Sequence, residues 1–196
     1  QDRSSAASDV YKRQEKRSLE PIATESGRDF IVRVKFDDLK PDTPYHVQTL
    51  IGNDKNDLTP GPYANFRTHP GKDSTKPVSF VVVTGMNYAK FHGDDRMDLA
   101  LHLKNNNTKL PAPHSKPDKH LGYPSLDSIL RLKPNFFVGT GDNIYYDTPP
   151  GDDHRAQHLH ELRQKWHEQF VQPRYRKMFG AVPVSYTHLR AHETSG

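Results

Sequence analysis

Two glycine-containing turns carry the residue types best able to do chemistry in this chain. The first, at 84–88, reads TGMNY, and the second, at 139–147, reads GTGDNIYYD. Glycines permit a sharp bend, after which Asp142 can present its carboxylate at the edge of the sheet. Tyr145, three residues later, can bring its phenol into the coordination sphere of the same metal ion. Oxygen ligands of this kind suit calcium, magnesium, manganese or ferric iron. The residues alone leave two interpretations open: a hard-metal site, or a Gly-Asp turn with tyrosines packed beside it.

Both turns follow segments that we predict to be short buried strands. Residues 77–83, PVSFVVV, form a β-branched run typical of a strand covered on both faces of a parallel sheet, and a second apolar run precedes Gly139. Between them, 122–132 predicts a helix with Ser125 as its N-cap. Strand, crossover helix and strand make a βαβ unit, and ligands gather at the carboxyl ends of such strands. This order predicts a site at the edge where the two turns begin.

The rest of this α/β region is predicted to hold one more helix and one more strand. The helix, at 154–170, is amphipathic, is ended by Pro173, and spaces its apolar residues at helical intervals: Ala156, Leu159, Leu162, Trp166 and Phe170. The segment FGAVPV at 179–184 opens a third strand.

Residues 30–70 show the shorter periodicity of β-strands. The segment FIVRVKF at 30–36 alternates apolar and polar residues, a second alternating run follows Tyr45, and YANFRTHP at 63–70 supplies a closing strand after the turn residues of 52–62. Tyr45 stands just after a Pro-containing corner, so its hydroxyl can return to the backbone as in the tyrosine corner of immunoglobulin-like sandwiches. Three such strands predict part of a fibronectin-III-like β-sandwich.

Composition excludes several classes of protein. The 196 residues include no cysteine, which removes disulfides, iron–sulfur clusters and cysteine nucleophiles. No run approaches the roughly 20 apolar residues that cross a bilayer, and the opening QDRSSAASDV lacks the apolar stretch of a signal peptide. The net charge of +4 is scattered, so we expect no nucleic-acid-specific binding.

The two ends do not continue the patterns of the core. Residues 1–14 and 185–196 lack apolar periodicity, and both resemble peptides translated from sequencing-adapter read-through in metagenomic assemblies. We therefore expect both to be artefacts and the chain to be an internal fragment of a longer protein. The hydrophilic segment GKDSTKP at 71–77 is the expected linker between its two regions.

Other clusters of functional residue types have simpler alternatives. His154 and His158 stand four residues apart and could chelate a metal, but no carboxylate completes the spacing, which favours a solvated helix face. Asp94, Asp95 and Asp98 either approach the site or form a solvated turn and helix start. The sequence has no zinc-protease motif, nucleophile elbow, Walker loop or dinucleotide fingerprint.

The chain resembles the PhoD-type alkaline phosphatases, a branch of the calcineurin-like metallophosphoesterases. Three segments carry the resemblance: PVSFVVVTGMNY, GYPSLDSILRLKPNFFVGTGDNIYYDTP and RQKWHEQFVQPRYRKMFGAVPV. It implies the N-terminal part of an α/β metallophosphoesterase core, a βαβ unit plus a helix, over 78–184. That core would be preceded by part of a fibronectin-III-like β-sandwich over 15–70.

The resemblance also implies a dinuclear centre holding calcium and iron. Asp142 matches the family's Gly-Asp carboxylate, the expected catalytic residue and metal ligand, and Tyr145 falls on the tyrosine that ligates ferric iron. The family's cysteine ligand falls on Met86, whose thioether is a poor ligand for ferric iron. Either other metals are used, or Asn87 takes over as the ligand.

The implied function is metal-dependent hydrolysis of phosphate mono- or diesters by a secreted or periplasmic parent protein, with a phosphate ester as substrate. The family continues from its third strand into an Asp-Asp-His motif that this sequence lacks. We therefore expect the fragment itself to be inactive. The alternative is a non-catalytic fragment or binding module, and the sequence assigns neither a physiological substrate nor an oligomeric state.

Overall fold

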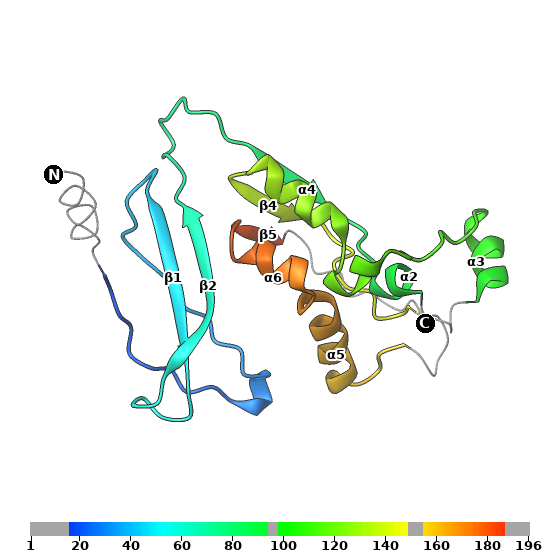
Figure 1. Cartoon of the computed structure of the whole chain (residues 1–196), viewed down its shortest axis with the longest axis horizontal. Helices are drawn as coiled ribbons and strands as arrows, with labels where there is room; N and C mark the ends of the chain where they lie inside the picture. Colours follow the sequence, from blue (N-terminus) through cyan, green and yellow to red (C-terminus); the bar gives the residue numbers. More distant parts are fainter. Residues whose placement is uncertain (1–15, 94–97, 149–154, 187–196) are drawn as a thin grey trace. The chain divides into compact units, whose positions relative to one another are not determined.

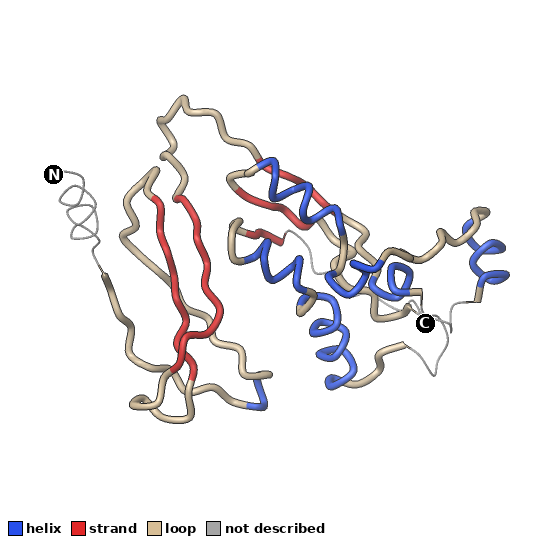
Figure 2. Tube along the Cα trace, viewed as in Figure 1, coloured by secondary structure: helices blue, strands red, loops and turns tan. Residues whose placement is uncertain are grey.

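The computed structural model describes residues 16–93, 98–148 and 155–186. Contacts between residues divide the chain into two units, Gln1–Lys35 and Phe36–Gly196. The segment 71–77 carries neither helix nor strand, and Figure 2 draws the part of the chain between residues 67 and 80 as loop. Its role as a domain boundary stays a prediction.

The strand predicted at 30–36 is wrong. The described part of the first unit holds one short 3-10 helix, η1 (Ser26–Arg28), and Phe30 follows it with a left-handed φ of 56°. Residues 31–36 are in no strand, and the alternate apolar side chains of the run, from Phe30 to Phe36, are exposed. A period-2 pattern makes a strand only where another strand offers its edge, and neither sheet of the described residues includes this segment.

An antiparallel hairpin opens the second unit. Strands β1 (Pro44–Ile51) and β2 (Thr59–Arg67) pair with Tyr45 opposite Phe66, and their rings stack with centroids 5.6 Å apart. Figure 1 shows the pair in cyan. The hydroxyl of Tyr45 accepts a hydrogen bond of 2.8 Å from the backbone N–H of Lys40. The predicted return of this hydroxyl to the backbone is confirmed, whereas the fibronectin-III-like sandwich stays a prediction.

The closing strand begins earlier than predicted, because Thr59–Pro62 belong to β2 and not to the turn. The register shifts between Gln48 and Leu50. At this irregularity the Gln48 amide donates to the carbonyl of Gly61 over 2.7 Å, and the Thr49 hydroxyl donates to that of Pro62 over 2.5 Å. Side chains of β1 thus donate to carbonyls of β2 at the place where the regular ladder is interrupted.

Three parallel strands form the second sheet. They are β3 (Phe80–Val83), β4 (Phe136–Gly139) and β5 (Val184–Tyr186), in the order β3-β4-β5. The strand pairing therefore confirms the predicted βαβ order. The third strand begins at Val184, later than predicted, and its last residues lie in the segment expected to be an artefact.

In the described parts of the connections between these strands, the structure has six helical segments. Between β3 and β4 lie α2 (Tyr88–His92), α3 (Leu99–Asn106), η2 (Pro117–Leu121) and α4 (Pro124–Leu132), and between β4 and β5 lie α5 (Leu159–Phe170) and α6 (Pro173–Phe179). None of the helices in the described ranges has the length and apolar character needed to cross a membrane.

Two proline positions differ from the prediction. The N-cap of α4 is Tyr123 and not Ser125, because Pro124 takes the first helical position, where its missing N–H costs nothing. Pro173 likewise begins α6, a helix that the sequence did not predict. Proline thus marks the start of a new helix at both places.

The apolar core lies between α4, α6 and the sheet. Its buried members are Tyr123, Leu126, Ile129, Phe137, Tyr175, Met178 and Val182, with Val81 and Val83 of β3 packed against them. The other two β3 side chains, Phe80 and Val82, are 56% and 52% exposed. The prediction that β3 is covered on both faces is therefore wrong for the described structure, in which successive side chains alternate between core and solvent.

A nearly buried guanidinium connects α6 to α4 and to the segment before it. Arg174 donates from Nε to Oδ2 of Asp127 and from an η nitrogen to Oδ2 of Asp118, each over 2.6 Å. Its other η nitrogen donates to the carbonyl of Gly122 over 2.6 Å. Such a fork satisfies several groups in fixed directions, which a lysine could not do.

Candidate functional site

The two glycine-containing turns meet at the carboxyl edge of the parallel sheet. The backbone N–H of Thr140 donates to the carbonyl of Val83 over 3.0 Å, and the Thr84 hydroxyl donates to the carbonyl of Gly141 over 3.1 Å. Because β3 and β4 run parallel, their carboxyl ends reach the same edge. This arrangement agrees with the predicted position of the site.

The turn after β4 brings Asp142 and Tyr145 together. Gly141 has a φ of 125°, a backbone conformation that residues other than glycine rarely adopt. Asp142 follows in the left-handed region with a φ of 48°. The Tyr145 hydroxyl donates to Oδ2 of Asp142 over 3.0 Å. Burial, followed by this hydrogen bond and the charge of Asp142, raises the pKa of Tyr145 to about 12. The phenol is therefore neutral near pH 7 in the absence of a cation.

Asn87, the third candidate ligand, caps a helix. It is the N-cap of α2, and its Oδ1 accepts from the backbone N–H of Lys90 over 3.0 Å. Its Nδ2 is buried and has no hydrogen-bond partner within the described ranges, as is also true of Asn143 Nδ2. The oxygen that would serve as a metal ligand already caps a helix, so Asn87 is a weaker candidate than Asp142 or Tyr145.

Met86, at the position of the expected cysteine ligand, forms part of the core wall. Its sulfur accepts a hydrogen bond of 2.9 Å from the Tyr175 hydroxyl, and its carbonyl accepts one of 3.0 Å from the Gln169 amide. A thioether held in this way serves packing and has little ligand character.

The donor set fits only part of a metal centre. Asp142 and Tyr145 supply two oxygen atoms of the kind that hard cations prefer. Across the residues that the structure describes, no three His, Cys, Asp or Glu side chains gather as a metal-binding group. A dinuclear centre would need further ligands, so the two metals remain a prediction.

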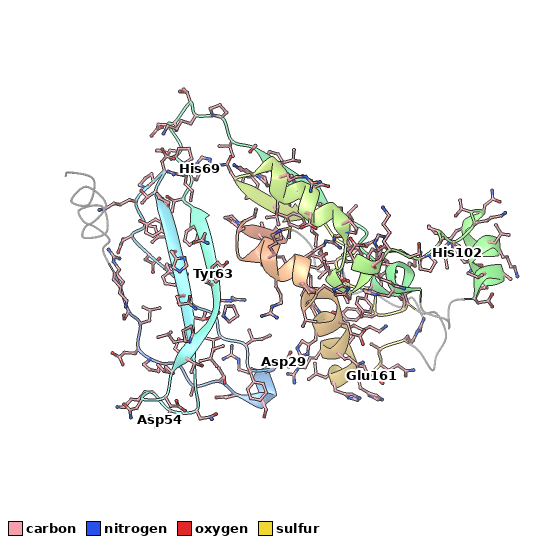
Figure 3. The ribbon with its side chains drawn as sticks, viewed as in Figure 1. Asp29, Asp54, Tyr63, His69, His102 and Glu161 are labelled. Atoms are coloured by element: carbon pink, nitrogen blue, oxygen red, sulfur yellow. The ribbon has the colours of Figure 1, made fainter. Side chains whose placement is uncertain are left out.

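The other sequence candidates have structural roles or lie outside the described residues. Asp98 caps α3 by accepting from the N–H of Leu101 over 2.9 Å, as expected of a helix start. His158 is the N-cap of α5, and Glu161, labelled in Figure 3, accepts from the His158 backbone N–H over 2.8 Å. The remaining candidates, His154, Asp94 and Asp95, lie outside the described residues.

Sequence reasoning missed the residues of α5 that contact the two turns. The helix begins at Leu159 instead of at 154, and Leu159 is exposed although it was assigned to the apolar stripe. Its most buried residue is Gln169, which is 2% exposed. The one sequence signal was a glutamine directly beside the apolar Phe170, and this is too common to indicate a buried polar contact.

The described chain is a mixed α/β structure with two small sheets. No protein-family model, curated protein or solved structure matches the sequence or the fold. Support for a function therefore comes from the geometry of the chain's own residues and from the motifs of its sequence.

Proposed function

We propose that the chain carries part of the active site of a metal-dependent phosphoesterase that hydrolyses phosphate mono- or diesters. The observation that carries the proposal is the 3.0 Å contact of Tyr145 and Asp142 at the carboxyl edge of a parallel βαβ sheet. This edge is where open α/β sheets collect their ligands. The resemblance to PhoD-type phosphatases supports the same reaction and a parent protein secreted or periplasmic in location.

Asp142 and Tyr145 would hold a cation from one turn. When bound, a metal ion lowers the pKa of water and neutralises charge on a transferring phosphoryl group. The Asp142 carboxylate supplies negative charge, and the left-handed turn that begins at Gly141 presents it at the end of β4. Tyr145 orients that carboxylate through its hydroxyl. Met86 has no ligand role in this proposal because its sulfur faces the Tyr175 hydroxyl.

The alternative function is a non-catalytic binding module. The exposed side chains of Phe80 and Val82, on the face of β3 opposite the core, favour it. An apolar sheet face of this kind suits contact with another protein surface. Metal binding distinguishes the two functions, because a binding module has no need of Asp142 as a ligand.

The test first measures the affinity of the 196-residue chain for Mn²⁺, calcium and ferric iron by titration. It then measures hydrolysis of a chromogenic phosphate ester with each metal. Asp142→Asn should lose metal binding, and with it any hydrolysis, because the amide lacks the carboxylate's charge. The matched control is Asp73→Asn, an exposed residue of the 71–77 segment, which should bind like the unmodified chain. Equal metal affinity in the two variants would contradict the proposal.

A further inference from the structure

Helix α5 contacts both turns of the candidate site. From one position, Trp166 Nε1 donates to the Tyr146 hydroxyl over 2.5 Å, next to Tyr145. Three residues later, Gln169 Nε2 donates to the carbonyl of Met86 over 3.0 Å, next to Asn87. Residues three apart lie on the same face of a helix. One helix face therefore holds the turn after β4 and the turn after β3.

The Gln169 amide has one orientation that satisfies its surroundings. Its Nε2 donates to the Met86 carbonyl and to the Tyr175 hydroxyl, while its Oε1 accepts from the Tyr123 hydroxyl over 3.0 Å. A flipped amide would set an oxygen against the Met86 carbonyl, and two acceptors cannot bond each other. Because Gln169 is almost fully buried, an unmade hydrogen bond here would be costly. The amide is thus a fixed connection between α5 and the Met86 turn.

Two further contacts, one from α5 and one from the segment before it, reach the chain after β4. The Lys165 ammonium donates to the carbonyl of Thr148 over 2.7 Å, and the backbone N–H of Ala156 donates to the carbonyl of Tyr146 over 2.8 Å. The strand ends are already joined at Thr84 and Gly141. Beyond that point the turns leave the sheet, so their spacing depends on contacts from outside it.

We propose that Gln169 and Trp166 are the positioning residues of the candidate site, and that α5 sets the distance between the Met86–Asn87 turn and the Asp142–Tyr146 turn. This inference rests on the proposed function for the cation that Asp142 and Tyr145 would hold, in a turn that is bonded to the turn after β3 through Thr84 and Gly141. Neither residue is one of the candidate ligands, and their contacts are to Tyr146 and Met86. Both act through the backbone or side chains adjacent to the candidate ligands.

The test uses the full chain and two variants that each remove one contact. Gln169→Met removes the donor to Met86 at nearly constant size, and Tyr146→Phe removes only the hydroxyl that accepts from Trp166. The matched control is Gln164→Met, the same substitution on an exposed position of α5. Amide hydrogen exchange is measured without metal, and Mn²⁺ affinity is measured by quenching of Trp166, the single tryptophan of the sequence.

We expect faster exchange at 84–88 in Gln169→Met and at 140–148 in Tyr146→Phe, with α4 amides and the Gln164→Met chain unchanged. Mn²⁺ affinity should fall roughly tenfold in both variants, as when outer partners of metal ligands are removed. Unchanged exchange in the two turns, or unchanged affinity despite faster exchange, would overturn the positioning role. An unmodified chain that binds no Mn²⁺ would instead overturn the proposed function, and exchange alone would then decide whether α5 holds the turns.

Discussion

The hydroxyl of Tyr145 donates to the carboxylate of Asp142 across a single turn, over 3.0 Å. The contact depends on the left-handed backbone at Gly141 and Asp142, which bends the chain directly after β4. It links the acidity of the phenol to the charge of the carboxylate, so a change at one residue should be measurable at the other.

Asp142→Asn should lower the pKa of Tyr145 from about 12, because the substitution removes the negative charge that favours the neutral phenol. Burial, the largest cause, remains, so the pKa should stay above its ordinary value of 10.0. An ultraviolet difference titration against Tyr145→Phe isolates this phenol among the nine tyrosines. Identical midpoints with and without the Asp142 charge would exclude the coupling.

The same shift has a consequence for stability at alkaline pH. The folded-state pKa of Tyr145 is raised, so its contribution is complete below the unfolded value of about 10. It is lost as the pH rises through the folded value of about 12. Tyr145→Phe should therefore reduce the loss of stability over this range.

Asp118 should make stability sensitive to acid. Hydrogen bonds from His114 and Arg174 lower the pKa of this carboxyl to about 2, so the ionised form is favoured in the fold. The contribution is present above the unfolded pKa of about 3.9 and is lost as the pH falls toward 2. Asp118→Asn should flatten the decline in stability between these values, as measured by urea unfolding at successive pH values. A decline of unchanged slope would show that the carboxyl contributes nothing to it.

Two leucines of α4 should respond very differently to truncation. Leu126 is fully buried in the core, whereas Leu132 at the end of the same helix is 71% exposed. Leu126→Ala removes buried methyl groups and leaves a cavity, which should lower the free energy of unfolding by about 3 kcal/mol. Leu132→Ala, the control, should change it by less than about 0.5 kcal/mol. Equal losses in urea unfolding would place the core elsewhere.

Local patterns sufficed to predict single strands and helices and contacts between residues close in the sequence. The β-branched run before Thr84 and the apolar run before Gly139 predicted the parallel strands, and the apolar spacing of 122–132 predicted α4. Tyr45 stands only five residues after Lys40, whose backbone N–H donates to its hydroxyl. This contact could therefore be predicted as well. Asp142 and Tyr145 are three residues apart, which made their meeting foreseeable from spacing alone.

Tertiary structure decided whatever depends on a distant partner. The alternation of 30–36 predicted a strand, but a strand needs an adjacent edge, and no described sheet supplies one there. Gln169 and Met86 are 83 positions apart in the sequence. No periodic pattern of residues predicts that the buried Gln169 amide donates to the Met86 carbonyl. The sequence by itself therefore determined the local elements and the Asp142–Tyr145 pair. Only long-range packing decided which helix contacts the two turns beside that pair, because buried polar groups find their partners in three dimensions and not along the chain.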